Sequence, residues 1–244
     1  MDPKLVITKD EGGQPVHPTE FKSMIGGLRY LVHIHPDIWH AVGIVSRFME
    51  RPTDMHLNAA KRILRYVKGT LSFGLVYSKN SGNNMLTGYS DSDLAGNIDD
   101  RKSTGGMCYY LNDNLITWVS QKQKYVALSS CEAEFIAATA AACQGIWLQK
   151  LLSEVSDSYV GPVVLYVDNK SAIDLAKNPV FHGRSKHIDI RYYFIRECVE
   201  RGEIIIKYVK TDEQKVNVLT KVLPVVKFEK MGQLLGVKNL AEQV

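Results

Sequence analysis

Residues 162–170 read PVVLYVDNK, in which an uninterrupted apolar run, residues 162–167, is followed directly by Asp168. A strand that is apolar on both faces is typical of a parallel or mixed sheet that is covered on both sides. A second run of this kind, EIIIKYVK, spans residues 203–210. The chain is therefore expected to contain a mixed sheet with helices on its faces.

The segments around these two runs supply the rest of such a sheet. The alternating stretch MLTGYSDSD, residues 85–93, predicts a strand, and residues 105–123 predict a hairpin that turns at NDN. Helical patterns fill residues 129–155, 171–178 and 185–202, and a last one, interrupted at Pro224, begins near residue 211. The order βββαβααβα predicts an antiparallel half that continues into a parallel half through crossover helices.

The chain before residue 85 has a different sequence pattern, with a polar start followed by helical spacing of apolar residues. Residues 1–16 are polar and predict a poorly ordered leader, whereas residues 17–84 predict helices that end at a run of Gly, Asn and Ser. The domain prediction is a leader at 1–16, a helical segment at 17–84 and an α/β domain at 85–238. With 244 residues and 45% hydrophobic content, the chain can bury a core.

Composition narrows the compartment more than the function. The net charge of +4 permits nucleic-acid binding without requiring it. The cysteines form no C-x-x-C pair, which favours reduced, buried thiols, and no signal peptide or membrane-spanning run is visible, so an intracellular protein (cytoplasmic or nuclear) is expected. The RILR string at residues 62–65 matches the R-x-L-R motif of secreted effectors, but that motif matters only after a secretory signal. We expect Arg62 and Arg65 to lie on the solvated face of a basic helix whose other face contains Ile63 and Leu64.

Three acidic residues stand where an α/β sheet collects ligands. Asp91 and Asp168 end two predicted strands, and the long helix opens with SSCEAEF. Each acid alone could be a cap or a solvated strand end. Together they predict a cluster that cations must neutralise, and a set of carboxylates suits Mg²⁺ or Mn²⁺ better than zinc.

The helix offers two glutamates for this cluster. Ser129 and Glu132 have the S-x-x-E spacing of a capping box, which gives Glu132 a structural role. Glu134 lies two positions further on, about 200° round the helix. Glu134 is therefore the predicted ligand.

Long motifs in this chain resemble the ribonuclease H domain of copia-type LTR-retrotransposon Pol polyproteins, particularly the plant ones. They include YSDSDLAG, DDRKSTGG, VALSSCEAEFIA, VDNKSAIDLAKNPVFHGRSKHIDIRYYFIRE and LTK. PTEFKSMIGGLRYL, PDIWHAVGIVSRFM and AAKRILRYVKGT resemble the thumb and connection that precede this domain in the same polyproteins. The resemblance implies an α/β ribonuclease H-like fold, a five-stranded mixed sheet with flanking helices, plus a small helical N-terminal region.

The resemblance also implies a reaction, the hydrolysis of the RNA strand of an RNA–DNA hybrid with two Mg²⁺ ions, for which Mn²⁺ could substitute. Asp91 would bridge the ions, and Glu134 and Asp168 would complete the metal ligands. The family's fourth acid corresponds to Asn217, which offers a carbonyl oxygen but no charge, so metal binding should weaken there. Asp212 and Glu213 could compensate, although Thr211 or Asp212 could instead cap the final helix.

A substrate-binding rim is a further expectation. Scattered basic residues are also typical of a solvated face, so the rim is one of two interpretations. Three histidines near the N-terminus are expected to be structural. No membrane partner or small-molecule cofactor is expected, and the alternative function is a catalytically silent nucleic-acid-binding or protein-interaction module. The predicted substrate-binding residues are Ser92, Asn169, Lys122, Arg184, Lys186 and His187.

Overall fold

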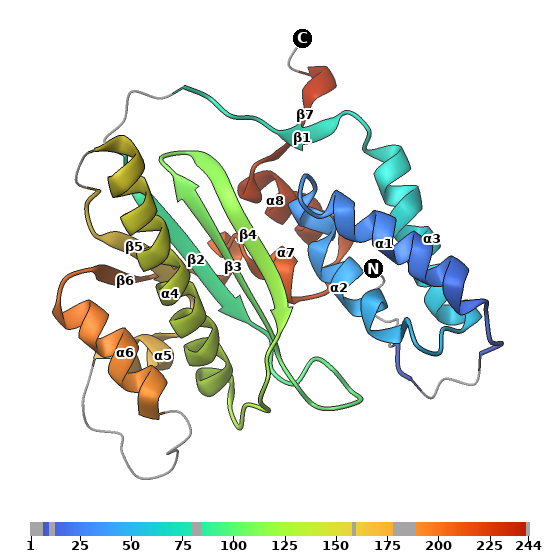
Figure 1. Cartoon of the computed structure of the whole chain (residues 1–244), viewed down its shortest axis with the longest axis horizontal. Helices are drawn as coiled ribbons and strands as arrows, with labels where there is room; N and C mark the ends of the chain where they lie inside the picture. The colour runs from blue at the N-terminus through green and yellow to red at the C-terminus, as the bar shows by residue number, and fades with distance from the viewer. Residues whose placement is uncertain (1–6, 10–12, 80–83, 158–159, 178–188, 243–244) are drawn as a thin grey trace.

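The computed structural model describes residues 7–9, 13–79, 84–157, 160–177 and 189–242. Its centre is a five-stranded sheet in the order β4-β3-β2-β5-β6, with helices on both faces (Figure 1). The strands are β2 (Leu86–Ser92), β3 (Thr104–Leu111), β4 (Asn114–Lys122), β5 (Val163–Val167) and β6 (Ile204–Tyr208). The helices of this part are α4 (Ser130–Ser156), α5 (Lys170–Lys177), α6 (Asp189–Glu200), α7 (Asn217–Thr220) and α8 (Val225–Leu235).

The strand directions divide the sheet into two halves. β2, β3 and β4 are antiparallel to one another, whereas β5 runs parallel to β2 and β6 runs parallel to β5. This is the predicted arrangement of a hairpin-built half followed by a parallel half. The prediction of a ribonuclease H-like, five-stranded mixed sheet with flanking helices is therefore confirmed.

Two cores cover the faces of the sheet. On one face α4, α5 and α6 pack against the strands around Tyr109, Phe135 and Leu165. On the other face α7 and α8 pack against Cys108, Tyr110 and Trp118. Among the described residues, α4 is the helix long and apolar enough to cross a membrane, but it packs on the sheet with most of its alanines buried. The four cysteines are free thiols; Cys108 and Cys198 are buried, as expected for all four, but Cys131 is partly exposed and Cys143 is exposed.

The helical N-terminal segment has a core of its own and docks on the β4 edge of the sheet. Its helices are α1 (Pro18–Leu31), α2 (Trp39–Val45) and α3 (Asp54–Gly69), with 3-10 turns at Pro36–Ile38 and Ser46–Phe48. The buried Nε1 of Trp118 donates a 2.9 Å hydrogen bond to the main-chain oxygen of Val32. Arg62 and Arg65 are exposed on α3, as expected, whereas Ile63 between them is buried in the core of this segment.

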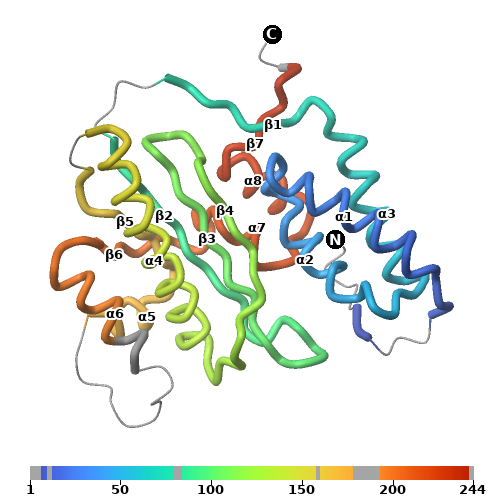
Figure 2. Tube along the Cα trace, viewed as in Figure 1, coloured from blue at the N-terminus to red at the C-terminus, as the bar shows by residue number. Residues whose placement is uncertain are grey.

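A second, two-stranded sheet joins the segment after α3 to the C-terminal part of the described chain. β1 (Phe73–Leu75), directly after the N-terminal helices, pairs with β7 (Val237–Asn239), near the C-terminus. Figure 2 traces the two segments side by side at one end of the molecule. The sequence did not predict this pairing, because each strand has only three residues and shows no alternating pattern.

The end of the chain is divided more finely than expected. The last helical segment was predicted to begin near residue 211 and to be interrupted at Pro224; the interruption is present, but the part before it contains only the four-residue α7, Asn217–Thr220. Pro224 then precedes α8, which accounts for the break because proline cannot donate the hydrogen bond of a helix interior. A last 3-10 turn spans Leu240–Glu242, and an earlier one spans Thr211–Glu213.

Candidate metal centre

Three carboxylates converge at one edge of the central sheet. Oxygen atoms of Asp91, Glu134 and Asp168 all lie within 4.8 Å of one another. Asp91 is near the end of β2 and Asp168 directly follows β5, and these parallel neighbours are paired up to Ser90 and Val167. Among the described residues, this is the one group of three or more His, Cys, Asp or Glu side chains whose ligand atoms lie close enough together to share a metal ion.

The start of α4 determines which glutamate reaches this edge. The hydroxyl of Ser129 caps the helix by accepting a hydrogen bond from the backbone N–H of Glu132 at 3.1 Å. The carboxylate of Glu132 turns back and accepts from the backbone N–H of Leu128 at 2.8 Å. Glu134 instead is buried among the acids. The structure thus places the two glutamates as their spacing predicted.

The electrostatics of the acids suit a cation. Burial, with Asp91 and then Asp168 nearby, raises the pKa of Glu134 to about 10. Burial and the charge of Asp91 also raise the pKa of Asp168. Oε2 of Glu134 is buried without a hydrogen-bond partner. A buried, unpartnered carboxylate oxygen beside two other acids fits a hard divalent ion, which would replace the proton and supply the missing contact.

The segment around α7 closes the site from the opposite face of the sheet. Nζ of Lys221 lies 2.8 Å from Oδ1 of Asp91 and 3.1 Å from Oδ1 of Asn217. The Thr220 hydroxyl donates to Oδ2 of Asp91. Burial alone would lower the pKa of Lys221, but the charge of Asp91 and the neighbouring acids raises it. Lys221 therefore contributes a permanent positive charge to the cluster.

Asn217 itself is buried and held at both ends of its amide. Nδ2 donates to the main-chain oxygen of Thr211 at 2.7 Å, while Oδ1 accepts from Lys221. The Thr211 side chain in turn hydrogen-bonds Asp168 and opposes the rise of its pKa. The fourth position is thus linked to two of the three acids, although it carries no charge itself.

The expected substitutes for a fourth acid lie elsewhere. The Asp212 side chain is 80% exposed and pairs with Lys227 at 3.4 Å, so it points away from the cluster. The expectation that Thr211 or Asp212 caps the final helix was wrong, because residue 216 precedes α7 and no side chain caps that helix. Thr211 hydrogen-bonds a metal-site acid instead.

Of the predicted substrate-binding residues, the structure describes three. Ser92 is buried, and its hydroxyl hydrogen-bonds Asp93 and Thr104 main-chain oxygens. Oδ1 of Asn169 accepts from the backbone of Ala172 at the start of α5. Lys122 is partly exposed at the end of β4 and pairs with Asp100 at 2.6 Å. Arg184, Lys186 and His187 lie outside the described residues.

The histidines of the N-terminal segment form no site with these acids. His40 is buried, and burial together with Arg47 lowers its pKa to about 3, so it stays neutral. His33 packs edge-on against Trp39 at 5.7 Å, and His35 lies 3.7 Å from Asp37. These contacts agree with the structural role expected for the three histidines.

Sequence reasoning missed side chains that position the cluster. Nε2 of Gln123 donates to Ser92 Oγ and to the main-chain oxygen of Ala133, which joins β4, β2 and α4. From the N-terminal segment, a guanidinium nitrogen of Arg47 lies 3.1 Å from Oγ1 of Thr104. The sequence carries a signal for Lys221 in the LTK motif and in its i, i+4 spacing from Asn217, and it carries none for Gln123 or Arg47.

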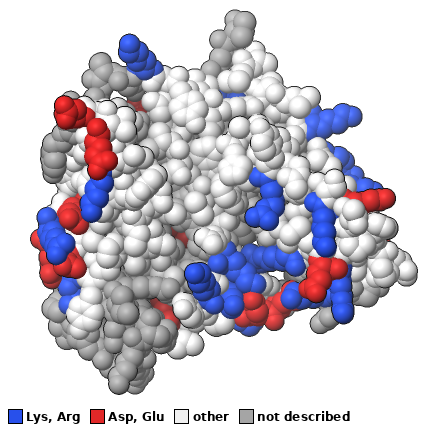
Figure 3. All heavy atoms as spheres, viewed as in Figure 1, with Lys and Arg blue, Asp and Glu red and all other residues white. Residues whose placement is uncertain are grey.

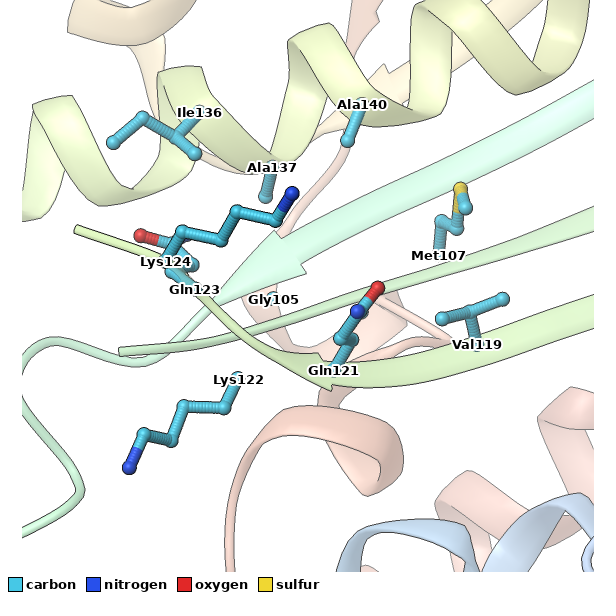
Figure 4. Close-up of a pocket in the computed structure, with 11 residues that line it drawn as sticks. Gly105, Met107, Val119, Gln121, Lys122, Gln123, Lys124, Ile136, Ala137 and Ala140 are labelled. Carbon is cyan, nitrogen blue, oxygen red and sulfur yellow. The ribbon is translucent and has the colours of Figure 1, made fainter. Parts of the chain in front are cut away.

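Two hollows adjoin this edge of the sheet. A pocket of about 210 Å³ lies between α4 and the β3–β4 hairpin, where Lys124 and Gln121 reach toward it while Lys122 points away (Figure 4). A groove of about 340 Å³ between the N-terminal helices and β4 contains Arg29, Arg47 and Lys122. Figure 3 shows Lys and Arg side chains gathered on this part of the surface.

The sequence of this chain is similar to parts of known retrotransposon polyproteins. The Pol polyprotein of transposon TNT 1-94 from Nicotiana tabacum is 44% identical over 240 residues, or 98% of this chain and 18% of that polyprotein. The Pol polyprotein of transposon RE1 from Arabidopsis thaliana is 41% identical over 241 residues, or 98% of this chain and 16% of the relative. This chain belongs to the copia-type retrotransposon Pol family. The Pol segment spans less than a fifth of the length of these relatives.

Other likenesses of the Pol segment are partial. A protein named secreted RxLR effector protein 161, from Plasmopara viticola, is 40% identical over 129 residues, or 52% of the segment and 90% of that protein. LC11-RNase H1, isolated from compost, superposes with a TM-score of 0.42 at 13% identity over 56% of the segment and 93% of that chain. A foamy viral protease-reverse transcriptase in complex with dsDNA superposes with a TM-score of 0.48 at 14% identity, over 82% of the segment and 39% of that chain. No family model matches the segment.

Proposed function

We propose that this chain is a metal-dependent endonuclease that hydrolyses the RNA strand of RNA–DNA hybrids. The observation that carries the proposal is the convergence of Asp91, Glu134 and Asp168 within 4.8 Å at the edge of the sheet. The unpartnered Oε2 of Glu134 supports it, because a buried carboxylate oxygen needs a cation or a donor. Membership of a Pol family supports it further, since such a protein would meet hybrids within the cell.

Asp91, Glu134 and Asp168 would hold two Mg²⁺ ions, or Mn²⁺ in their place, with Asn217 as a weakened fourth ligand. Bound ions would supply an activated water and charge stabilisation at the leaving oxygen. Glu134 would bind an ion as the carboxylate, so its proton would pass to solvent. The Thr211 hydroxyl orients Asp168, and Gln123 fixes β4 against α4.

The substrate would lie across the edge of the sheet where the acids meet. The groove with Arg29, Arg47 and Lys122 opens at the end of β4, and its cations suit phosphates. Recognition of the RNA strand would rest on its 2′-hydroxyl groups. Asn169, next to Asp168, and Ser92, next to Asp91, remain proposed contacts, as do Arg184, Lys186 and His187.

A second function, a catalytically silent module, is favoured by one observation. The amide of Asn217 donates to the Thr211 main-chain oxygen and accepts from Lys221, so both ends of a neutral side chain have partners at this position. A silent module would bind hybrids in a salt-dependent manner without cutting them. A protein-interaction role would instead use the exposed face of α3 that carries Arg62 and Arg65 of the RILR string.

The deciding experiment is cleavage of a hybrid with a labelled RNA strand, in Mg²⁺ or Mn²⁺, by the wild type beside Asp91→Asn. Metal-dependent products with 5′-phosphate and 3′-hydroxyl ends from the wild type alone would support the nuclease. The absence of any difference between the two proteins would overturn it. Salt-dependent binding without cleavage would then support the silent module.

A further inference from the structure

The ammonium of Lys221 lies where a cation is expected. Its Nζ contacts Oδ1 of Asp91 at 2.8 Å and Oδ1 of Asn217 at 3.1 Å. The first oxygen belongs to Asp91, the acid expected to be shared by two ions. The second is the only side-chain oxygen of Asn217, which stands where the family has its fourth acid. An ammonium and a divalent ion cannot both occupy one set of oxygens. The contact therefore bears on how many ions the site accepts.

The ligands divide into an open side and a closed side. On the closed side both oxygens of Asp91 are engaged by consecutive residues, Lys221 and Thr220. On the open side Oε2 of Glu134 is buried and unpartnered. A first ion can therefore meet Glu134 and Asp168 without displacing a cation, whereas a second ion beside Asn217 must displace Lys221.

The charges of the site favour one ion. When all three carboxylates are ionised, they and the Lys221 ammonium leave two negative charges, which one divalent ion neutralises. A second ion would bring two positive charges into a site where Asp91 is fully buried. An aspartate at position 217 would offset part of this charge, but the amide of Asn217 offsets none. A phosphodiester of the substrate would supply the missing negative charge.

Lys221 can also leave without unfolding the site. It follows the last residue of α7 and has an extended backbone, with φ −132° and ψ 147°. Its side chain is 34% exposed, whereas that of Asp91 is 0% exposed. Swinging the ammonium into solvent breaks only contacts of its side chain.

We propose that Lys221 occupies the position of the second divalent ion in the substrate-free protein, so that the chain binds one ion until substrate displaces the ammonium. This inference rests on the proposed function, because it concerns the same acids. It makes Lys221 a residue that controls the order of ion and substrate binding.

The test counts Mn²⁺ ions bound by the substrate-free full chain, by titration calorimetry or by electron paramagnetic resonance of free Mn²⁺. The wild type is expected to bind one ion tightly. Lys221→Met should bind a second, with a dissociation constant at least roughly tenfold below that of any second wild-type site. Lys221→Arg keeps the charge and should retain one ion.

Lys227→Met is the matched control, because it removes a lysine of the same region that pairs with exposed Asp212 and touches no site acid. It should bind one ion. Identical ion counts and affinities for the wild type and Lys221→Met, or two tight ions in the wild type, would overturn the inference and leave the nuclease proposal standing. No Mn²⁺ binding by either protein, as in Asp91→Asn, would overturn both.

A measurement on the wild type covers the case in which Lys221→Met does not fold. In ¹⁵N-lysine-labelled protein, the Nζ resonance of Lys221, assigned with Lys221→Arg, reports its contact with Asp91. One equivalent of Mg²⁺ should leave this resonance in its hydrogen-bonded position. Its shift to the position of solvated lysines at that point would overturn the inference.

Discussion

Nδ2 of Asn217 donates a 2.7 Å hydrogen bond to the main-chain oxygen of Thr211. An aspartate has no N–H to give, so Asn217→Asp would set a carboxylate against that oxygen and beside Asp91. Without metal, we expect the free energy of unfolding to fall by about 1–3 kcal/mol, measured by urea denaturation with a chelator present. Saturating Mg²⁺ should stabilise this variant more than it stabilises the wild type.

The matched control for this prediction is Asn112→Asp in the β3–β4 turn. Asn112 uses Oδ1 to accept from the backbone N–H of Met85 at 3.0 Å, which an aspartate can also do. Its stability should change by less than about 0.5 kcal/mol. If Asn217→Asp is as stable as the wild type in chelator, the donated hydrogen bond is not the reason for an amide at this position.

The proton on Glu134 should make the metal-free protein less stable as pH rises. Folded, Glu134 keeps its proton up to a pKa of about 10, whereas unfolded it loses the proton near its ordinary value of 4.5. Between these values the folded state binds more protons, so the free energy of unfolding falls with rising pH, by at most about 1.4 kcal/mol per pH unit. Urea denaturation of Glu134→Gln in chelator should show a flatter dependence between about pH 6 and pH 8 than the wild type.

The same proton should appear in solution when an ion binds. Near neutral pH we expect about one proton to be released per wild-type chain on Mn²⁺ binding, detected by calorimetry in buffers of different ionisation enthalpy. Glu132→Gln, which alters the helix start and leaves the cluster intact, should release the same amount. Mn²⁺ binding without proton release would contradict a protonated Glu134.

Arg47 should connect the N-terminal helices to the loop beside the site. It hydrogen-bonds Thr104, whose backbone N–H also bonds Asp93. Burial raises the pKa of Asp93 to about 6, against the opposing charge of Arg47. Arg47→Met should therefore raise this pKa above 6, followed by carbon NMR of the carboxyl group, and should cost about 1–2 kcal/mol of stability.

Arg65→Met is the control for Arg47, since Arg65 is exposed on α3. It should leave both the Asp93 titration and the stability unchanged within about 0.5 kcal/mol. An unaltered Asp93 titration in Arg47→Met would show that this arginine has no electrostatic influence on the loop.

Substitution by alanine should destabilise the protein at one of two adjacent glycines of β3 and be tolerated at the other. A Cβ on Gly106, which pairs with Asp91, would lie 2.7 Å from both Thr220 Cγ2 and Val216 Cγ1. Gly106→Ala should therefore push α7 from the sheet and cost about 1–3 kcal/mol. Gly105→Ala faces α4, where the nearest atom lies at 3.4 Å, and should be tolerated. Thermal denaturation of the two variants checks this, and equal melting temperatures would contradict it.

The sequence predicted the parts of the site that depend on local pattern. Asp91 and Asp168 were found because an apolar strand predicts where its end lies, and Glu134 was separated from Glu132 by helix periodicity. Lys221 could not be found in this way. Its partner Asp91 lies 130 residues away, and only the packing of α7 on the sheet brings the two together.

The position of the N-terminal helices on the sheet also could not be predicted from the sequence pattern. Amphipathic spacing shows that a helix has an apolar face, but it does not say which surface covers that face. Here the bond from Trp118 to Val32 and the pairing of β1 with β7 fix the answer. One is a single hydrogen bond and the other a three-residue ladder, and both join segments far apart in the chain.

The pairing of β1 with β7 also determines how the molecule bears a mechanical load. Phe73 lies opposite Asn239 and Leu75 opposite Val237, in antiparallel register. A pull on the chain between α3 and the central sheet would meet this short ladder first, before the five-stranded sheet carries tension. The weakest link under force would then be this three-residue pairing, and the acid cluster in the central sheet would remain intact after the first rupture.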